Sequence, residues 1–204
     1  DGPSADAALA LYRSAPELPL EMWITANNHG HNLNADPFNA GRTIPAPNRD
    51  EQMDAVLNFI GRALGGESIE RRIHYYVMGA ETFRDTQAWP PRDVVSRTLF
   101  LGPQARLVDR APRAQQVRYA VDFEAGTGEN TRWSTQFGPP PAYADRRDAD
   151  QRLIVFDSEP MTEDMELVGQ PIIDLWLSAN RDDAAVFVYV EDVAPDGRVT
   201  YITE

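Results

Sequence analysis

The pattern of the chain changes after Glu67, and this change constrains the fold more than any other feature of the sequence. Up to that residue, helical and strand patterns alternate; beyond it, short β-rich runs follow one another with turn residues between them. Alternation of helix and strand is typical of an α/β sheet, whereas a succession of short strands is typical of an antiparallel sandwich or jelly roll. The sequence therefore predicts two domains, over residues 1–67 and 68–204.

The first domain begins with a helical pattern over 4–15, followed by an apolar run over 18–26 whose flanking prolines favour a strand. Because the run is almost continuously apolar, we expect this strand to be buried on both faces. A loop rich in Asn, Gly and Pro spans 27–48. A second helical pattern covers 49–66, where apolar residues recur on one stripe and two glycines stop the helix.

The second domain is predicted to be all-β. Its most distinctive turn is Pro195-Asp196-Gly197, which indicates a hairpin. The arginine pairs Arg71-Arg72 and Arg146-Arg147 are interpreted as surface residues. Strands are expected over 71–79, 96–102, 105–109, 116–123, 152–158, 171–179, 184–193 and 198–204.

Two of the three histidines, His29 and His31, lie one residue apart just after the strand at 18–26. Such a pair could bind a divalent metal ion, but the only other histidine, His74, lies in the β-rich part, so we expect no metal site. A histidine loop after the last strand of an α/β sheet is also where a serine hydrolase keeps its general base. Asp1 precedes the first helix, at the place where the carboxylate that orients such a base is expected.

The charge and composition exclude several other functions. A formal net charge of −13 opposes binding to nucleic acid phosphates. No apolar run approaches the roughly 20 residues that cross a bilayer, so we expect a soluble protein without a membrane partner. The absence of cysteine excludes a thiolate nucleophile here but does not decide between a cytoplasmic and a secreted protein. The oligomeric state stays open.

Four segments resemble the cocaine esterase and X-Pro dipeptidyl-peptidase type of serine hydrolase. "DGPSADAALALYRS" and "LEMWITANNHGH" resemble its acid and histidine segments, and "RRIHYYVMGAETFRDTQAWPP" its entry into the C-terminal domain. The most specific match is 153–197, which is similar over its whole length to core strands of that domain. The resemblance implies the C-terminal end of an α/β-hydrolase domain followed by an antiparallel β jelly-roll of galactose-binding-like type.

The resemblance also implies the roles of particular residues. Asp1-Gly2 matches the family's acid and His29-Gly30 its catalytic histidine, with His31 as the fallback base. The approach to the histidine departs from the family, because Asn27 and Asn28 stand where a Gly-Pro-Trp type of segment is usual. No Gly-x-Ser-x-Gly nucleophile motif occurs in the chain, so we expect the serine to lie outside it.

The expected reaction is therefore cleavage of a small-molecule ester or amide without a cofactor, and we expect the chain alone to be inactive. Two alternatives remain: a dipeptidyl-peptidase activity instead of an esterase activity, or a non-catalytic β-sandwich that binds a ligand.

Overall fold

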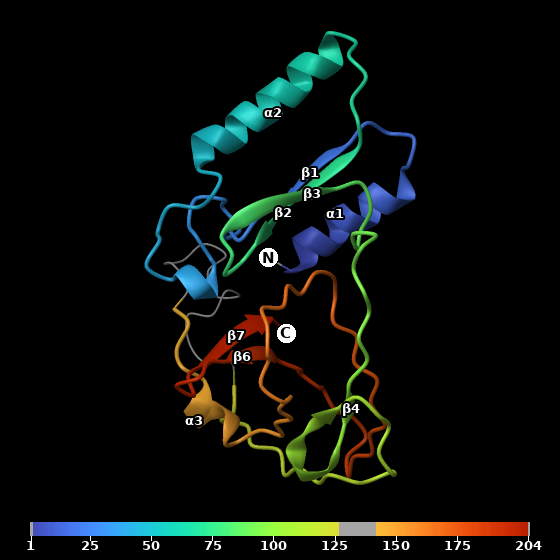
Figure 1. Ribbon diagram of the computed structural model, residues 1–204, viewed down its shortest axis with the longest axis vertical. Coiled ribbons are helices and arrows are strands. Elements are labelled where there is room, and N and C mark those ends of the chain that lie inside the picture. Colours follow the sequence, from blue (N-terminus) through green and yellow to red (C-terminus); the bar gives the residue numbers. More distant parts are fainter. Residues whose placement is uncertain (1, 127–141, 204) are drawn as a thin grey trace. The chain divides into compact units, whose positions relative to one another are not determined.

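The computed structural model describes residues 2–126 and 142–203, which fall into two compact units (Figure 1). The first unit comprises Asp1–Asp93 with Thr127–Tyr143, and the second comprises Val94–Gly126 with Ala144–Glu204. No helix in the described part of the chain is long and apolar enough to cross a membrane. The boundary between 67 and 68 expected from the sequence stays a prediction.

The first unit is a three-stranded mixed sheet with two helices. The strands β1 (Glu21–Ile24), β2 (Arg72–Val77) and β3 (Thr82–Thr86) lie in the order β1-β2-β3. β1 pairs with β2 in parallel, and β2 pairs with β3 in antiparallel fashion. The helices are α1 (Gly2–Ser14) and α2 (Arg49–Leu64), which confirms both predicted helices. β2 falls within the strand predicted at 71–79, whereas β3 was not predicted. The α/β-hydrolase domain itself stays a prediction.

The core of this unit lies between α1 and one face of the sheet. Leu9 and Tyr12 of α1 pack with Ile73 of β2, and Met22 and Ile24 of β1 lie against them. Side chains alternate between the two faces of a strand, so the residues between these point to the opposite face.

The opposite face of β1 is only partly covered. Trp23 is 41% exposed, and Glu21 and Trp23 line a cavity that α2 borders. The prediction that the strand at 18–26 is buried on both faces is therefore wrong. The apolar run correctly indicated burial of one face against α1. It did not indicate how loosely the second face is covered.

Helix α2 begins and ends as its sequence indicates. Asn48 accepts hydrogen bonds from the backbone of Asp50 and Glu51, and the Glu51 side chain returns the bond in a capping box. Gly66 adopts the left-handed conformation just after the helix, with φ of 74°. The helix has no buried residue, and its apolar stripe is exposed: Met53, Val56, Leu57, Ile60 and Leu64.

The second unit contains small antiparallel sheets. β4 (Phe100–Leu101) pairs with β5 (Leu107–Val108), and β6 (Val190–Val193) pairs with β7 (Val199–Thr203). The described part also holds the short helix α3 (Arg147–Asp150). Together these elements make the second unit β-rich, as the sequence predicts.

The predicted hairpin at Pro195-Asp196-Gly197 is confirmed. β6 and β7 flank this turn in antiparallel register, and Gly197 has a φ of 81°, where a side chain would be strained. The turn is closed by a hydrogen bond from the Gly197 amide to the Ala194 carbonyl.

Three predicted strands, at 116–123, 152–158 and 171–179, form no ladder in the described residues. A strand exists only when a neighbour satisfies its backbone groups, and these segments meet none beyond an isolated bridge between Arg106 and Asp157. Trp176 is 97% exposed as a result. The jelly roll itself therefore stays a prediction.

Candidate functional site

The loop after β1 carries His29 and His31 at the tip of a closed turn. The Ala35 amide donates to the Ala26 carbonyl at 2.8 Å, and the Asn28 amide donates to the Leu33 carbonyl at 3.0 Å. A side chain at Gly30 would bring a Cβ atom to 3.0 Å from Oδ1 of Asn32, so the tip leaves little room. The segment after β1 therefore reverses direction at the two histidines, and its two arms lie side by side.

Buried asparagines form the base of this loop. Asn27, Asn28 and Asn34 are 5, 7 and 6% exposed, and Asn27 forms an isolated bridge with Asn34. Oδ1 of Asn28 accepts hydrogen bonds from the backbone amides of Asn32 and Leu33, both at 3.0 Å. Side chains of this length can replace a missing backbone partner in a turn, and Asn28 does so here.

Both histidines are exposed at the tip. His31 has a φ of 54°, a left-handed conformation that costs a residue with a side chain about 1 kcal/mol or more. Asp1 lies outside the described residues, so its pairing with His29 stays a prediction. The structure places His29 and His31 together, with His74 on the sheet.

The segment that follows the tip is fixed by a buried acid. Asp36 is fully buried, and its Oδ1 accepts from the Phe38 amide at 2.9 Å at the start of the short 3-10 helix Pro37–Asn39. Burial and the negative charge of Asp36 raise the pKa of Tyr76 to about 12. The buried acid therefore borders a tyrosine hydroxyl that is harder to ionise than usual.

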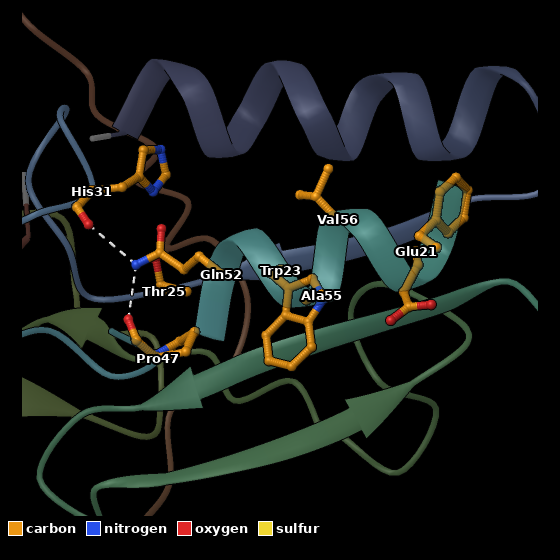
Figure 2. Close-up of a pocket in the computed structure, with 9 residues that line it drawn as sticks. Glu21, Trp23, Thr25, His31, Pro47, Gln52, Ala55 and Val56 are labelled. Carbon is orange, nitrogen blue, oxygen red and sulfur yellow. Dashed lines mark hydrogen bonds between the residues drawn. The ribbon is translucent and has the colours of Figure 1, made fainter. Parts of the chain in front are cut away.

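A cavity of about 260 Å³ lies beside the tip, between β1 and α2 (Figure 2). Trp23 and Thr25 line it from β1 and the residue after it, Val56 and Phe59 line it from α2, and His31 lies at one end. The walls are mostly apolar, with the imidazole and a few polar groups at the margin. The histidine loop thus borders a space that suits an apolar group of a small molecule.

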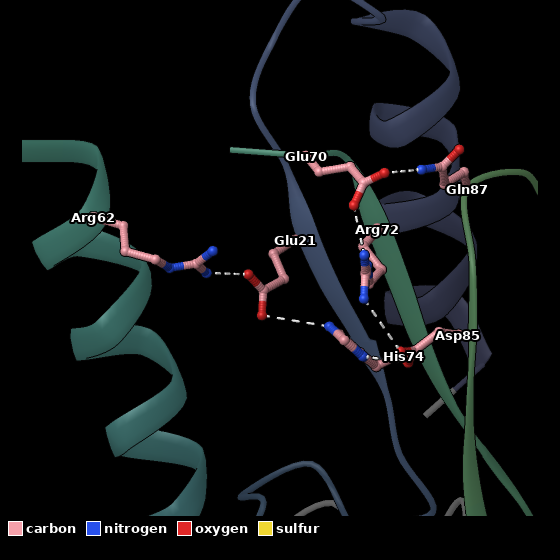
Figure 3. Close-up of polar contacts among 7 residues, drawn as sticks. All are labelled: Glu21, Arg62, Glu70, Arg72, His74, Asp85 and Gln87. Carbon is pink, nitrogen blue, oxygen red and sulfur yellow. Dashed lines mark hydrogen bonds and ion pairs between the residues drawn. The ribbon is translucent and has the colours of Figure 1, made fainter. Parts of the chain in front are cut away.

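A second polar cluster lies on the same face of the sheet (Figure 3). Nδ1 of His74 is 2.5 Å from Oδ1 of Asp85, and its Nε2 is 3.4 Å from Oε1 of Glu21. Arg62 of α2 pairs with Glu21, and Arg72 pairs with Glu70 at 2.5 Å. In the sequence, alternation over 71–79 places Arg72 and His74 on one face of a strand. Their partners lie in other parts of the chain, so the alternation does not predict them.

The His74 cluster does not have the geometry of a metal centre. No group of three or more His, Asp or Glu side chains among the described residues is arranged to hold a metal ion. Both imidazole nitrogens of His74 face carboxylates, so neither is directed at a free position for a nucleophile. We therefore interpret the cluster as a structural link between β1, β2, β3 and α2.

Two arginines interpreted as surface residues are buried or half-buried instead. Arg71 is half-buried and donates to the carbonyls of Ala15 and Leu18 at 2.7 and 2.5 Å. Arg146 is 5% exposed and pairs with Glu191 in the second unit. A guanidinium can be buried when its N–H donors are satisfied. Two adjacent arginines in a sequence do not reveal whether the fold supplies the acceptors.

Comparison with known proteins supports the resemblance seen in the sequence. Residues 69–204, more than half of the chain, match the X-Pro dipeptidyl-peptidase C-terminal non-catalytic domain. A Mycobacterium bovis protein and a Mycobacterium tuberculosis protein, each named as a serine esterase, are 30% identical to this chain over 212 residues. Each match covers 100% of this chain and 33% of the relative, so the chain spans about a third of these relatives' length.

No solved structure matches the chain. The family assignment therefore rests on the match over 69–204, and it agrees with the β-rich second unit. The chain belongs to the family of the X-Pro dipeptidyl-peptidase C-terminal non-catalytic domain, within the cocaine esterase and X-Pro dipeptidyl-peptidase group of serine hydrolases.

Proposed function

We propose that this chain is part of a serine hydrolase that cleaves ester or amide bonds of small molecules, with His29 as its general base. The observation that carries the proposal is the position of His29, at the exposed tip of the loop that follows the carboxyl end of β1. Sites of α/β folds form at this end of the strands. Asp1 is the acid that orients His29, and the nucleophilic serine lies in chain outside these residues.

In the proposed reaction, His29 takes the proton of the serine hydroxyl as its oxygen attacks the carbonyl carbon of the substrate. The tetrahedral intermediate collapses when His29 returns that proton to the leaving alcohol or amine, and an acyl-enzyme remains. Water, activated by the same imidazole, then releases the acid and restores the serine. Asp1 holds the imidazole in the tautomer that these transfers need.

Two features of the first unit favour a nucleophile supplied by further chain. β1 has a neighbouring strand on one side only among the described residues. The exposed apolar stripe of α2 also needs cover, because folded domains rarely leave such a stripe in water. A continuing hydrolase sheet would satisfy both, and relatives three times as long provide chain for it.

The second unit is assigned, on the same proposal, to a jelly roll of the galactose-binding-like type that supports the catalytic domain. The match to a non-catalytic domain over 69–204 supports this role. No candidate for the general base or its acid comes from the second unit. Its contribution is therefore to stability rather than to the chemical step.

The test uses the intact protein that contains this chain and p-nitrophenyl acetate as the ester. His29→Ala should lower kcat by several orders of magnitude, and Asp1→Asn by roughly 10⁴-fold if the tautomer argument holds. His31→Asn is the matched control: it removes the second imidazole, tolerates the left-handed backbone at this position and should retain most of the activity. A His31→Asn protein that is inactive beside an active His29→Ala protein would move the base to His31.

The same protein also decides between the alternative activities. An esterase hydrolyses the ester much faster than an X-Pro p-nitroanilide, whereas a dipeptidyl-peptidase prefers the anilide. A non-catalytic binding module would hydrolyse neither substrate, and His29→Ala would then change no rate above background.

A further inference from the structure

The loop that carries His29 is held by two side-chain amides, one inside the loop and one from α2. We propose that Asn28 and Gln52 are positioning residues that fix the orientation of His29 for catalysis. This inference rests on the proposed role of His29 as general base. Neither residue touches the reacting atoms, so each acts through the backbone of the loop.

Asn28 holds the loop from inside. Its Oδ1 accepts from the amides of Asn32 and Leu33 at 3.0 Å each, while its own backbone amide donates to the Leu33 carbonyl. The side chain is 7% exposed, so water cannot readily replace it as an acceptor. Because Asn28 directly precedes His29, these bonds set the direction in which the chain enters the catalytic position.

Gln52 holds the loop from outside (Figure 2). Its Nε2 donates to the carbonyl of His31 at 3.1 Å and to the carbonyl of Pro47 at 2.8 Å. Both N–H bonds of one amide group are therefore used, one on the histidine loop and one on the segment that leads into α2. The capping box of Asn48 fixes the first turn of α2, so Gln52 is anchored on a rigid element.

The backbone of His31 is bonded on both sides, to the backbone of Asn28 and to the side chain of Gln52. Its amide donates to the Asn28 carbonyl at 3.0 Å, and its carbonyl accepts from Gln52. A left-handed residue with a side chain keeps its conformation only when its surroundings fix it. The conformation of His31 in turn fixes the closure of the tip, and His29 lies within that closure.

The experiment compares matched variants of the intact protein. Asn28→Leu removes the acceptor while keeping the shape, and Asn28→Asp restores an acceptor oxygen. Gln52→Met removes both donors, and Asn58→Ala on the exposed face of α2 is the control. Small displacements of a catalytic group cost about 10- to 100-fold in rate, so Asn28→Leu and Gln52→Met should lower kcat to this extent. Asn28 does not line the cavity, so Asn28→Leu should do so with KM unchanged.

Asn28→Asp should recover most of the lost kcat, and Asn58→Ala should match the unmodified protein. Hydrogen exchange of the peptide over 26–35, followed by mass spectrometry in the same proteins, gives a readout independent of catalysis. Exchange should be faster in Asn28→Leu and in Gln52→Met. If Asn28→Leu fails to fold, Gln52→Met still tests whether the amides position the loop. Gln52 lies outside the loop, so its replacement by Met should leave the fold intact.

Each outcome decides a different claim. Unchanged exchange would show that the amides do not hold the loop, whatever the protein catalyses. Faster exchange with unchanged kcat, in a protein that His29→Ala inactivates, would overturn the positioning role alone. Full activity of His29→Ala would overturn the proposed function and the positioning role with it, while the exchange data would still decide whether the amides hold the loop.

Discussion

Nδ1 of His74 lies 2.5 Å from Oδ1 of Asp85, so an imidazole of β2 is bonded to a carboxylate of the neighbouring strand β3. The other ring nitrogen faces Glu21 of β1 at 3.4 Å, and the ring stacks on Trp23 with centroids 4.2 Å apart. A base and an orienting acid in contact are the mark of a catalytic pair. Here the second carboxylate occupies the position that a nucleophile needs, so the pair links three strands.

We expect His74→Gln to lower the free energy of unfolding of the first unit by about 1 to 2 kcal/mol, because it weakens bonds of a mostly buried ring. Asp85→Asn should cost less, about 0.5 kcal/mol, since its side chain is 49% exposed. Urea titration followed by circular dichroism gives both values, and the double variant gives their coupling. Glu17→Gln, an exposed change in the same unit, is the control.

Arg71 caps the carboxyl end of α1 from a distant part of the chain. Its guanidinium donates to the carbonyls of Tyr12, Ala15 and Leu18 and lies 4.2 Å over the Tyr12 ring. Arg71→Ala leaves these carbonyls without their donor, so we expect a loss of about 2 to 3 kcal/mol in the free energy of unfolding.

Arg71→Lys should recover only part of this loss, because an ammonium group cannot reproduce the planar fork of donors. Arg13→Ala, an exposed arginine of the same helix, should change stability by less than about 0.5 kcal/mol. Equal losses for the alanine variants of Arg13 and Arg71 would refute the cap. Thermal and urea unfolding, monitored by circular dichroism at the helix band, measures all three.

Glu191 gives the second unit a specific pH dependence. Burial raises the pKa of Glu191 above its ordinary value of 4.5, and nearby Asp150 adds to this, while Arg146 opposes it. The folded state therefore holds the proton more tightly than the unfolded state, so this group's contribution to stability is lost as the pH rises from about 4.5 through the raised pKa.

Glu191→Gln removes that titration. Between pH 4.5 and 7, the stability of the unmodified protein should thus fall relative to that of the variant, as hydrogen exchange of the β6 and β7 amides can measure. A difference between the two proteins that stays constant over this range, or that grows in the other direction, would contradict the assignment.

The sequence predicted those features that local residues determine. The helix at 4–15 was predictable because an apolar period marks it, and the helix at 49–66 because capping residues mark it as well. The hairpin around Gly197 was predictable because few residues allow its φ. The position of the His29 loop was predictable because the apolar run that forms β1 ends just before it. β3 was missed because its sequence, Thr82 to Thr86, is largely polar and lacks a strand's apolar alternation.

Features that depend on distant partners were not predictable. Arg71 and Arg146 looked like surface charges, since nothing near them in the sequence reveals the carbonyls and carboxylates that they meet in the fold. Asn28 likewise looked like any polar loop residue. The expected strands at 116–123 and 171–179 show the converse limit, because a good strand pattern forms no strand until a neighbour pairs with it.

Removal of metal should leave the candidate site unchanged. If His29 acts as a base and His31 is not a ligand, dialysis against EDTA should not alter the melting temperature of the chain or the esterase rate of the intact protein. Zinc analysis by mass spectrometry should find less than one ion per chain. An ion bound to both imidazoles would instead indicate metal-assisted hydrolysis.

The last prediction concerns the 204-residue chain by itself. Since the proposed nucleophile lies outside it, and the nucleophile and base act as a unit, the purified chain should hydrolyse p-nitrophenyl acetate at the background rate. A fluorophosphonate probe, which labels only an activated serine, should leave the chain unlabelled while it labels the intact protein and not its His29→Ala variant. Stoichiometric labelling of any serine in the chain, accompanied by turnover, would place the nucleophile within these residues and require a new assignment of the site.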